Sequence, residues 1–279
     1  RCGVVNIGLE GMMVIGTWFG AWAGWFYGPW YGVLAGLLGG ALFGLIHAIG
    51  TVTFQVDHIV SGVAINILAA GVARFLSVVA YADVPAGGAT QSPRVDERID
   101  KISIPYLSGG KINESDTSDV FGSLEALELF LVSDLFGLLG GLTRNISYFS
   151  ILAILLVPIS FWILWSTNFG LQLRSVGEYP VGSESVGVNV YLMKYVGVTI
   201  SGAFAGLAGA YLVIESAGIY REGQTGGRGF IGLAAMIFGN WKPLGTFLGS
   251  SLFGYADSLQ LRSEESVHGL LIILSLIHI

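Results

Sequence analysis

The sequence is short of charged residues. Lys, Arg, Asp and Glu supply only 11% of its 279 residues, whereas soluble domains average about 25%. A surface in contact with water needs more charge than this, so the composition excludes an ordinary soluble domain. Hydrophobic residues make up 53% of the chain, and apolar runs of about 20 residues, long enough to cross a bilayer, recur along it. Most of the surface is therefore expected to face lipid.

Residues and motifs for chemistry are also scarce. The single cysteine, Cys2, excludes an internal disulfide framework, and four scattered His residues predict no metal site. No phosphate-binding loop occurs, because Gly109-Gly110-Lys111 lacks the required spacing. No nucleophile elbow or triad order is visible, and the net charge of -6 disfavours nucleic-acid binding. We expect no enzyme activity, no cofactor and no metal in this chain.

The apolar runs predict an all-α, polytopic membrane protein that forms one transmembrane domain over 1–279. About seven or eight transmembrane or re-entrant helices are expected, over residues 7–27, 30–49, 58–81, 146–165, 195–214, 230–238 and 244–261, with another starting at 269. The run 230–238 is too short to span a bilayer. Because the chain lacks an initiating Met and stops within an apolar run, we expect sequence to be missing at both ends.

Two long polar stretches separate the apolar runs. Residues 83–145 hold ten acidic and five basic residues, a net charge of -5. Within them, 121–142 is amphipathic but carries Glu and Asp side chains that are costly at the bilayer centre, so a surface helix is predicted there. The stretch 168–194 predicts a helical turn near 183–188 and is a candidate for docking another protein, the alternative being a plain connector. The charges alone leave the orientation open.

Two regions of the sequence resemble each other. NIGLEGMMVIG, followed by GPWYGVLAGLLGGALFGLIHA, is similar to RGFIGLAAMIFG, followed by NWKPLGTFLGSSLFGYADS. The number of helices between them predicts that the two copies enter the membrane from opposite sides. Inverted repeats are typical of transporters, with the substrate path at the repeat interface. The alternative is chance similarity between Gly-rich apolar stretches.

Glycine recurs at every fourth position in the first two apolar runs. This spacing places the glycines on one face of a helix, where they allow backbones to approach closely in lipid. A sliding surface for alternating access is the functional alternative. The glycines expected to pack helices together are Gly16, Gly20, Gly24, Gly32, Gly36 and Gly40.

A few polar residues lie within or beside the apolar runs. Such residues are costly in a membrane and usually face a cavity or a polar partner. A neutral polyol or nucleoside would need hydrogen-bonding groups of this kind, and the alternative is interhelical bonding or placement at the interface. Phe230, the first residue of the short apolar run 230–238, is added to this set. The candidates for the substrate path are Asn6, Glu10, His58, Ser61, Asn66 and Phe230.

Four ordered motifs resemble a known family. GVVNIGLEGMM, DHIVSGVAINILAAGV, FGLQLRSVGEYPVGSESVGVNVYLMKY and GRGFIGLAAMIFGNWKPLG are similar to bacterial ABC-transporter permeases of the ribose and branched-chain amino acid group. Within that group, the motifs NIGLEGMM and RGFIGLAAMIFG are most similar to those of permeases for nucleosides or simple sugars. The resemblance covers nearly the whole chain outside 83–145.

The resemblance implies an importer in the bacterial cytoplasmic membrane. Its expected partners are an ABC ATPase that binds the ATP, a second permease subunit in a heterodimer, and an external substrate-binding lipoprotein. It also implies that 168–194 is a cytoplasmic coupling loop and that 83–145 is external. The residues that match the coupling segment are Arg174, Ser175, Gly177, Glu178 and Pro180.

The chain departs from the family pattern in three ways. Cys2 replaces a small residue, the external stretch is longer and more acidic than expected, and a complete subunit would have about ten helices. A secondary transporter or channel stays an alternative, with Glu10 and Glu215 as its only support. A branched-chain amino acid permease of the same family is a second alternative, and a membrane-embedded enzyme a third.

Overall fold

A computed structural model describes residues 1–96, 99–107, 109–112, 115–126, 136, 140 and 143–263. The predicted last run, which begins at residue 269, lies outside the described residues, as does most of the surface helix predicted over 121–142. Within the described part the fold is helical apart from one short hairpin. Its helices are α1 (Leu9–Tyr27), α2 (Pro29–Ala48), α3 (His58–Tyr81), α4 (Val120–Glu125), α6 (Tyr148–Ser166), α7 (Asn168–Glu178), α8 (Pro180–Ser185), α9 (Val190–Tyr211), α10 (Arg228–Phe238) and α11 (Pro243–Ser263).

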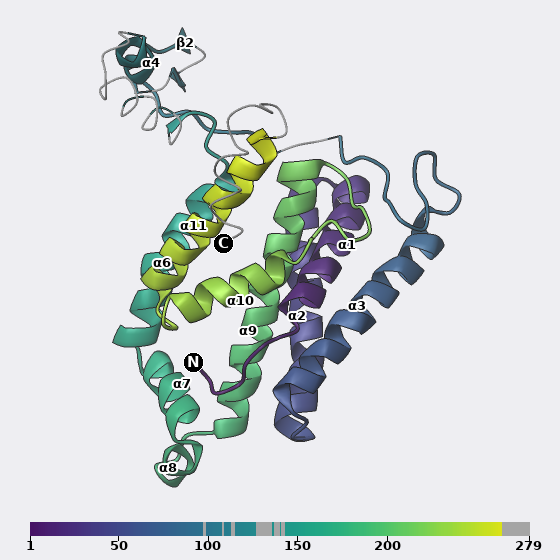
Figure 1. Cartoon of the computed structure of the whole chain (residues 1–279), viewed down its shortest axis with the longest axis vertical. Coiled ribbons are helices and arrows are strands. Elements are labelled where there is room, and N and C mark those ends of the chain that lie inside the picture. Colours follow the sequence, from purple (N-terminus) through teal and green to yellow (C-terminus); the bar gives the residue numbers. More distant parts are fainter. Residues whose placement is uncertain are drawn as a thin grey trace.

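Three helices, α1, α2 and α9, pack together as the centre of the molecule, and α3 covers one side of α1 (Figure 1). A tight turn makes α1 and α2 antiparallel neighbours. Gly28 adopts a φ of 100° between them, a left-handed conformation that glycine tolerates best. Pro29 follows as the first residue of α2, where its missing N–H is no loss.

The glycines of the four-residue spacing lie where these helices cross. A methyl group on Gly40 would overlap Gly202 O and lie 2.5 Å from Gly206 Cα of α9. One on Gly36 would lie 2.8 Å from Gly16 O of α1. In the structure the glycine faces of α1 and α2 converge on α9.

The glycines nearer the turn behave differently from one another. Gly32 and Gly20 also meet backbone to backbone, since a methyl group on Gly32 would lie 2.6 Å from Gly20 O. A methyl group on Gly24 would instead touch the Val95 side chain at 3.5 Å, an ordinary contact. Gly24 therefore faces the polar stretch that packs over the bundle, while its Cα also lies close to α2, 3.0 Å from where a methyl group on Gly32 would stand.

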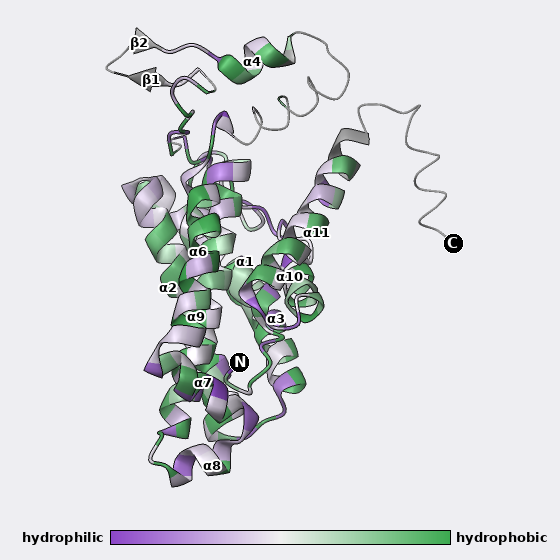
Figure 2. Ribbon diagram, turned by 90° about the vertical axis from the view of Figure 1, so that its left-hand side faces the viewer, coloured by the Kyte–Doolittle hydropathy of each residue, from purple (hydrophilic) through white to green (hydrophobic). Residues whose placement is uncertain are grey.

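Four helical segments in the described part are long and apolar enough to cross a membrane. They are Pro29–Thr53, His58–Tyr81, Tyr148–Ser166 and Val190–Ala217. Hydrophobic residues cover much of their length (Figure 2). α6 has no buried residue, so its apolar side chains need lipid, substrate or another protein around them. Two of the four extend as π-helical turns, η1 (Ile49–Thr53) and η2 (Leu212–Ala217), beyond α2 and α9.

The stretch 168–194 is helical over most of its length. It forms α7 and α8, and the turn predicted at 183–188 instead begins at Pro180. Thr167 starts α7, because its Oγ1 accepts a hydrogen bond from Gly170 N at 3.1 Å and so satisfies one of the free N–H groups of the first turn. Leu173 and Val176 are buried on one face of α7.

The stretch 83–145 divides into a part that stands away from the bundle and a part that packs into it. The strands β1 (Lys111–Ile112) and β2 (Ser115–Asp116) and the helix α4 stand away from the bundle (Figure 1). The segment before them packs into it instead, where Val95 and Ile99 are buried. Its backbone pairs with the segment after η2, through bonds such as Val95 N to Gly218 O at 2.8 Å.

α8 and α4 lie at opposite ends of the molecule (Figure 1), so the stretches predicted to be cytoplasmic and external are separated by the length of the bundle. α2 runs towards the end with α8, and α11 runs away from it. This is the direction that the inverted-repeat prediction requires for its second helices. The first helices differ, since α1 has 19 residues and α10 only 11. The repeat stays a prediction.

Candidate functional site

Two helix N-termini meet inside the bundle at Glu10. The Glu10 carboxylate accepts hydrogen bonds from Thr225 Oγ1 at 2.6 Å, from Gly227 N at 3.0 Å and from Gly229 N at 2.8 Å. It therefore caps α10 from the first turn of α1. A negative charge is favourable at a helix N-terminus, where free N–H groups and the helix dipole point towards it. Glycine is required at 229, since a methyl group there would lie 2.6 Å from Glu10 Cα.

Two asparagines hold the segment before α1 against its neighbours. Asn66 in α3 accepts from Gly11 N at 2.8 Å and donates to Ile7 O at 3.2 Å. Asn6 is buried and donates to Ser201 Oγ of α9 at 3.0 Å. Asn6, Glu10 and Asn66 thus gather around one short segment, where α1, α3, α9 and α10 meet. Their role in the substrate path stays a prediction.

The other predicted path residues lie apart from this group. His58 Nδ1 accepts from Val5 N at 3.4 Å, and Ser61 Oγ pairs with His47 Nδ1 at 2.8 Å between α3 and α2. Phe230 is 46% exposed on α10. Every polar member of the predicted set therefore has a partner on another segment. Bonding between segments is the alternative that the sequence left open, and the role of these residues in the substrate path stays a prediction.

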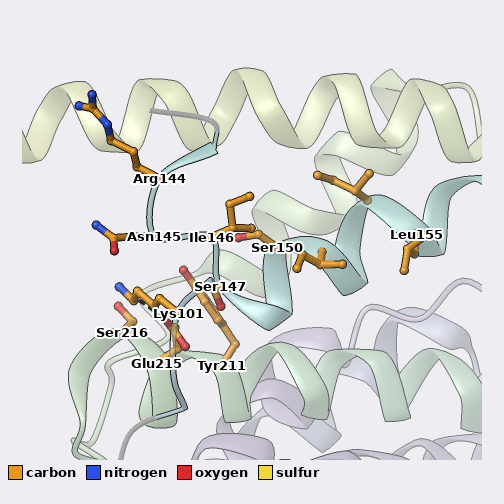
Figure 3. A pocket seen from close by; sticks show the side chains of 12 residues that line it. Lys101, Arg144, Asn145, Ile146, Ser147, Ser150, Leu155, Tyr211, Glu215 and Ser216 are labelled. Carbon is orange, nitrogen blue, oxygen red and sulfur yellow. Dashed lines mark ion pairs between the residues drawn. The ribbon is translucent and has the colours of Figure 1, made fainter. Parts of the chain in front are cut away.

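A cavity of about 670 Å³ opens at the end of the molecule away from α8, between α6, η2 and the segment from the polar stretch (Figure 3). Lys101 and Glu215 form an ion pair across it at 3.5 Å. The Glu215 carboxylate side chain is only 7% exposed, so its charge needs this partner. We call this cavity the outer pocket. It is lined by Lys101, Arg144, Asn145, Ile146, Ser147, Ser150, Ile151, Ile154, Leu155, Tyr211, Glu215 and Ser216.

Three further cavities continue from the outer pocket towards the other end, and each shares lining residues with the next. A cavity of about 560 Å³ between α6, α9 and α11 shares Ser150 and Tyr211 with the outer pocket. The next, of about 420 Å³, shares Phe204 and Ser250 with it. A last one, of about 260 Å³, reaches the coupling segment. We call this series the groove.

Three of the predicted coupling residues, Arg174, Gly177 and Glu178, line the last cavity of the groove. The Arg174 guanidinium stacks over the Trp165 ring, 5.3 Å from its centroid, and Arg1 stacks on the same ring at 5.6 Å. A methyl group on Gly177 would overlap Arg1 O, so the N-terminal segment lies directly on α7. Glu178 is exposed at the end of this helix.

The last two predicted coupling residues have local bonding roles. Ser175 Oγ donates to Gln172 O at 2.9 Å within α7. Pro180 is the first residue of α8, where its ring fixes a helical φ. Arg174, Ser175, Gly177, Glu178 and Pro180 are thus close together along α7 and α8, as their sequence spacing requires. Their contact with an ATPase stays a prediction.

Sequence reasoning missed the outer pocket. In the sequence, Glu215 supports only the alternative of a secondary transporter or channel, and its partner Lys101 lies 114 positions away in the polar stretch. No periodicity or motif joins the two. The one available signal was a carboxylate inside an apolar run, which predicts a partner without saying which residue it is.

Comparison with known proteins identifies the family. The family described as branched-chain amino acid transport system / permease component matches residues 1–279. The resemblance found in the four motifs is confirmed: the chain belongs to this family of ABC-transporter permeases and is a multi-pass membrane protein.

Relatives with named functions are similar over most of the chain. A guanosine ABC transporter permease of Bacillus subtilis is 40% identical over 94% of this chain and 74% of its own length. A nucleoside permease of Lactococcus lactis is 36% identical over 93% and 74%. A putative glucose permease of Haloferax volcanii is 30% identical over 95% and 71%. No solved structure matches the chain.

Proposed function

We propose that the chain is the permease subunit of an importer that carries a nucleoside across the bacterial cytoplasmic membrane. The observation that supports this most is the identity of 40% and 36% to permeases named for guanosine and for nucleosides, over more than nine-tenths of the chain. A simple sugar is the second substrate class, supported by the relative named for glucose.

The proposed partners follow from the same relatives. A permease component is one part of a transport system, and the ATP would be bound by a separate ATPase subunit. Bacillus subtilis has a second guanosine permease, 34% identical over 108 residues, and Lactococcus lactis a second nucleoside permease, 27% identical over 139 residues. This favours a heterodimer of two related permeases, served outside by a substrate-binding lipoprotein.

The proposed mechanism uses the end of the molecule that carries α7 and α8. Tyr179, Val181 and Val186 are apolar and exposed there, beside the exposed Glu178. An ATPase docked on this surface would move α7 when it binds ATP. α7 packs on α6 and α9, so its movement would be passed to the helices that border the groove. The permease itself performs no covalent chemistry in this proposal.

Uptake measurements test the substrate. The transporter that contains this chain, with its ATPase and lipoprotein, is expressed in cells that lack their own nucleoside importers. We expect uptake of labelled guanosine that excess unlabelled nucleoside abolishes and that ribose, glucose or leucine leaves unchanged. Competition by leucine alone would replace the proposal with an amino acid permease. Uptake that persists without the ATPase would favour a secondary transporter.

Charge reversal tests the coupling surface. Glu178→Lys places a cation on the exposed end of α7, and Asp83→Lys makes the same change on an exposed residue at the other end of the molecule. We expect the first variant to co-purify with less ATPase and to lose most uptake, and the second to behave as the unsubstituted transporter. Equal co-purification of the two variants would refute the assignment of α7 and α8 to the ATPase.

A further inference from the structure

The outer pocket carries polar groups that nothing in the described structure uses. Within the described residues, the Tyr211 hydroxyl, the Ser150 and Ser216 hydroxyls and the Asn145 side-chain amide have no hydrogen-bond partner. Figure 3 shows these side chains coming from α6, α9, η2 and the segment before α6, around one space. Polar groups that converge on a cavity from separate elements are the usual mark of a ligand site.

The charged side chains that line the pocket are paired, which suits a neutral ligand. Arg144 pairs with Asp119 at 2.6 Å, and the buried Glu215 carboxylate pairs with Lys101, so the Lys101–Glu215 pair offers hydrogen bonds without a net charge. A zwitterionic amino acid would need charged partners for its ammonium and carboxylate groups, whereas Lys101 and Glu215 are already paired with each other. A nucleoside has hydroxyls for the polar groups and a flat base for an aromatic ring. Tyr211 supplies that ring, packed edge-on against Phe149 with centroids 5.4 Å apart.

The size and the position of the pocket also favour a small-molecule site. Small-molecule sites measure about 300–1,000 Å³, and the outer pocket has about 670 Å³. Glu215 lies in the π-helical turn η2, and such turns occur often at functional sites because they disturb the regular ladder of hydrogen bonds. The segment after η2 leads to α10, whose start is capped by Glu10.

The groove below the pocket alternates aromatic rings with hydroxyl groups. Phe149, Tyr211 and Phe204 line its upper part together with Ser150 and Ser250, and the last cavity ends at Arg174, Gly177 and Glu178. A single subunit thus carries a series of adjoining cavities from the end predicted to be external to the segment predicted to contact the ATPase.

Resting on the proposed function, we infer that the outer pocket is the nucleoside-binding mouth of the substrate path and that the path follows the groove between α6, α9 and α11. Tyr211 stacks on the base, and the hydroxyls of Ser150 and Ser216 with the Lys101–Glu215 pair bind the sugar hydroxyls. The group around Glu10, Asn6 and Asn66 then holds helices together beside the path rather than binding the substrate.

Two neighbouring serines of α11 give a matched test of the path. Ser250 lines two cavities of the groove, whereas Ser251 lines none of those described and points about 100° away around the helix. Each is changed to Cys in the assembled transporter, and a water-soluble methanethiosulfonate reagent is applied. The unsubstituted chain, whose Cys2 is buried, serves as the reagent control.

We expect the reagent to modify Ser250→Cys and to reduce guanosine uptake at least about tenfold, with protection by added guanosine. Ser251→Cys should keep its uptake. Equal modification and equal loss at both positions, no modification of either, or modification of Ser250→Cys without loss of uptake would each overturn the path. If the unsubstituted transporter takes up no guanosine even before the reagent is added, the proposed function fails rather than the path.

Two tyrosines of similar exposure test the mouth. Tyr211 is 39% exposed in the pocket, and Tyr148 is 40% exposed at the start of α6, where it packs on Trp30. We expect Tyr211→Ala to raise the KM for guanosine about tenfold or more, as loss of one stacked base predicts, while Tyr148→Ala leaves it unchanged. Tyr211→Phe should restore most of the affinity. Equal KM values for the two alanine variants at normal expression would overturn the assignment of Tyr211.

Discussion

The contact between α2 and α9 allows a sharp prediction from a single methyl group. In Gly40→Ala, the new methyl carbon would lie 2.5 Å from Gly206 Cα and would overlap Gly202 O. Both are backbone atoms, so no side chain can rotate out of the way. Carbon atoms in contact prefer a separation of about 3.5–4.0 Å, so the two helices would have to move apart by about 1 Å.

The expected loss can be estimated from two opposing effects. Alanine favours a helix over glycine by about 1 kcal/mol. Overpacking a well-packed interior costs about 1–3 kcal/mol, and more where only backbone can move. A gap of about 1 Å also forfeits up to half the dispersion energy of the contacts along the seam. We therefore expect Gly40→Ala to destabilise the fold by about 2 kcal/mol.

Gly71→Ala is the control. Gly71 lies in the middle of α3, and a methyl group there would meet nothing within 4 Å. Thermal unfolding of the purified transporter in detergent should show a midpoint at least about 5 °C lower for Gly40→Ala, and an unchanged or slightly higher midpoint for Gly71→Ala. Equal midpoints would mean that α2 and α9 do not pack as closely as the structure describes, and would refute the reasoning.

Three further predictions concern Glu10, Gly177 and Tyr220. Glu10→Gln removes the charge that caps α10, so thermal unfolding should report a loss of about 1.5–3 kcal/mol. Gly177→Ala should displace the segment of Arg1 that lies on α7, and we expect faster proteolysis of that segment in the purified protein. Burial raises the pKa of Tyr220 to about 12 and the nearby Glu222 adds to it, so stability should be intact below about pH 10, the unfolded pKa, and decline towards pH 12. Tyr220→Phe should flatten that decline.

Each of these three has an outcome that contradicts it. A Glu10→Gln variant as stable as the unsubstituted protein would show that the carboxylate charge is not needed at α10. Unchanged cleavage in Gly177→Ala would place the N-terminal segment elsewhere. An alkaline decline that persists in Tyr220→Phe would assign it to other groups.

Much of the helical framework could be predicted because it rests on local signals. Because the bilayer sets the length of a spanning apolar run, the sequence predicted α3 at its observed limits, His58–Tyr81. It also predicted the ends of α1, α6 and α11 to within a few residues. α7 was missed because its residues are polar on one face, and its formation depends on burying Leu173 and Val176 against the bundle. Such burial is invisible to a search for apolar runs.

The predicted path residues show a second limit. A polar residue in an apolar run needs a partner, and the sequence cannot say whether that partner is a substrate or another helix. Asn66 meets Gly11 and Ile7, and Ser61 meets His47. The hydroxyls of Tyr211 and Ser150 have no hydrogen-bond partner among the described residues, yet by sequence alone both are ordinary residues of spanning helices.

The sequence by itself determined that this chain is a membrane protein, because 11% charged residues cannot cover a water-facing surface. It also predicted glycine faces that pack its helices, because a four-residue spacing places the glycines on one side of a helix. Only the tertiary structure decided that α9 is the helix they converge on and that Lys101 neutralises Glu215 across the outer pocket. Those contacts join residues far apart in the chain, and no local pattern specifies which distant segments come together.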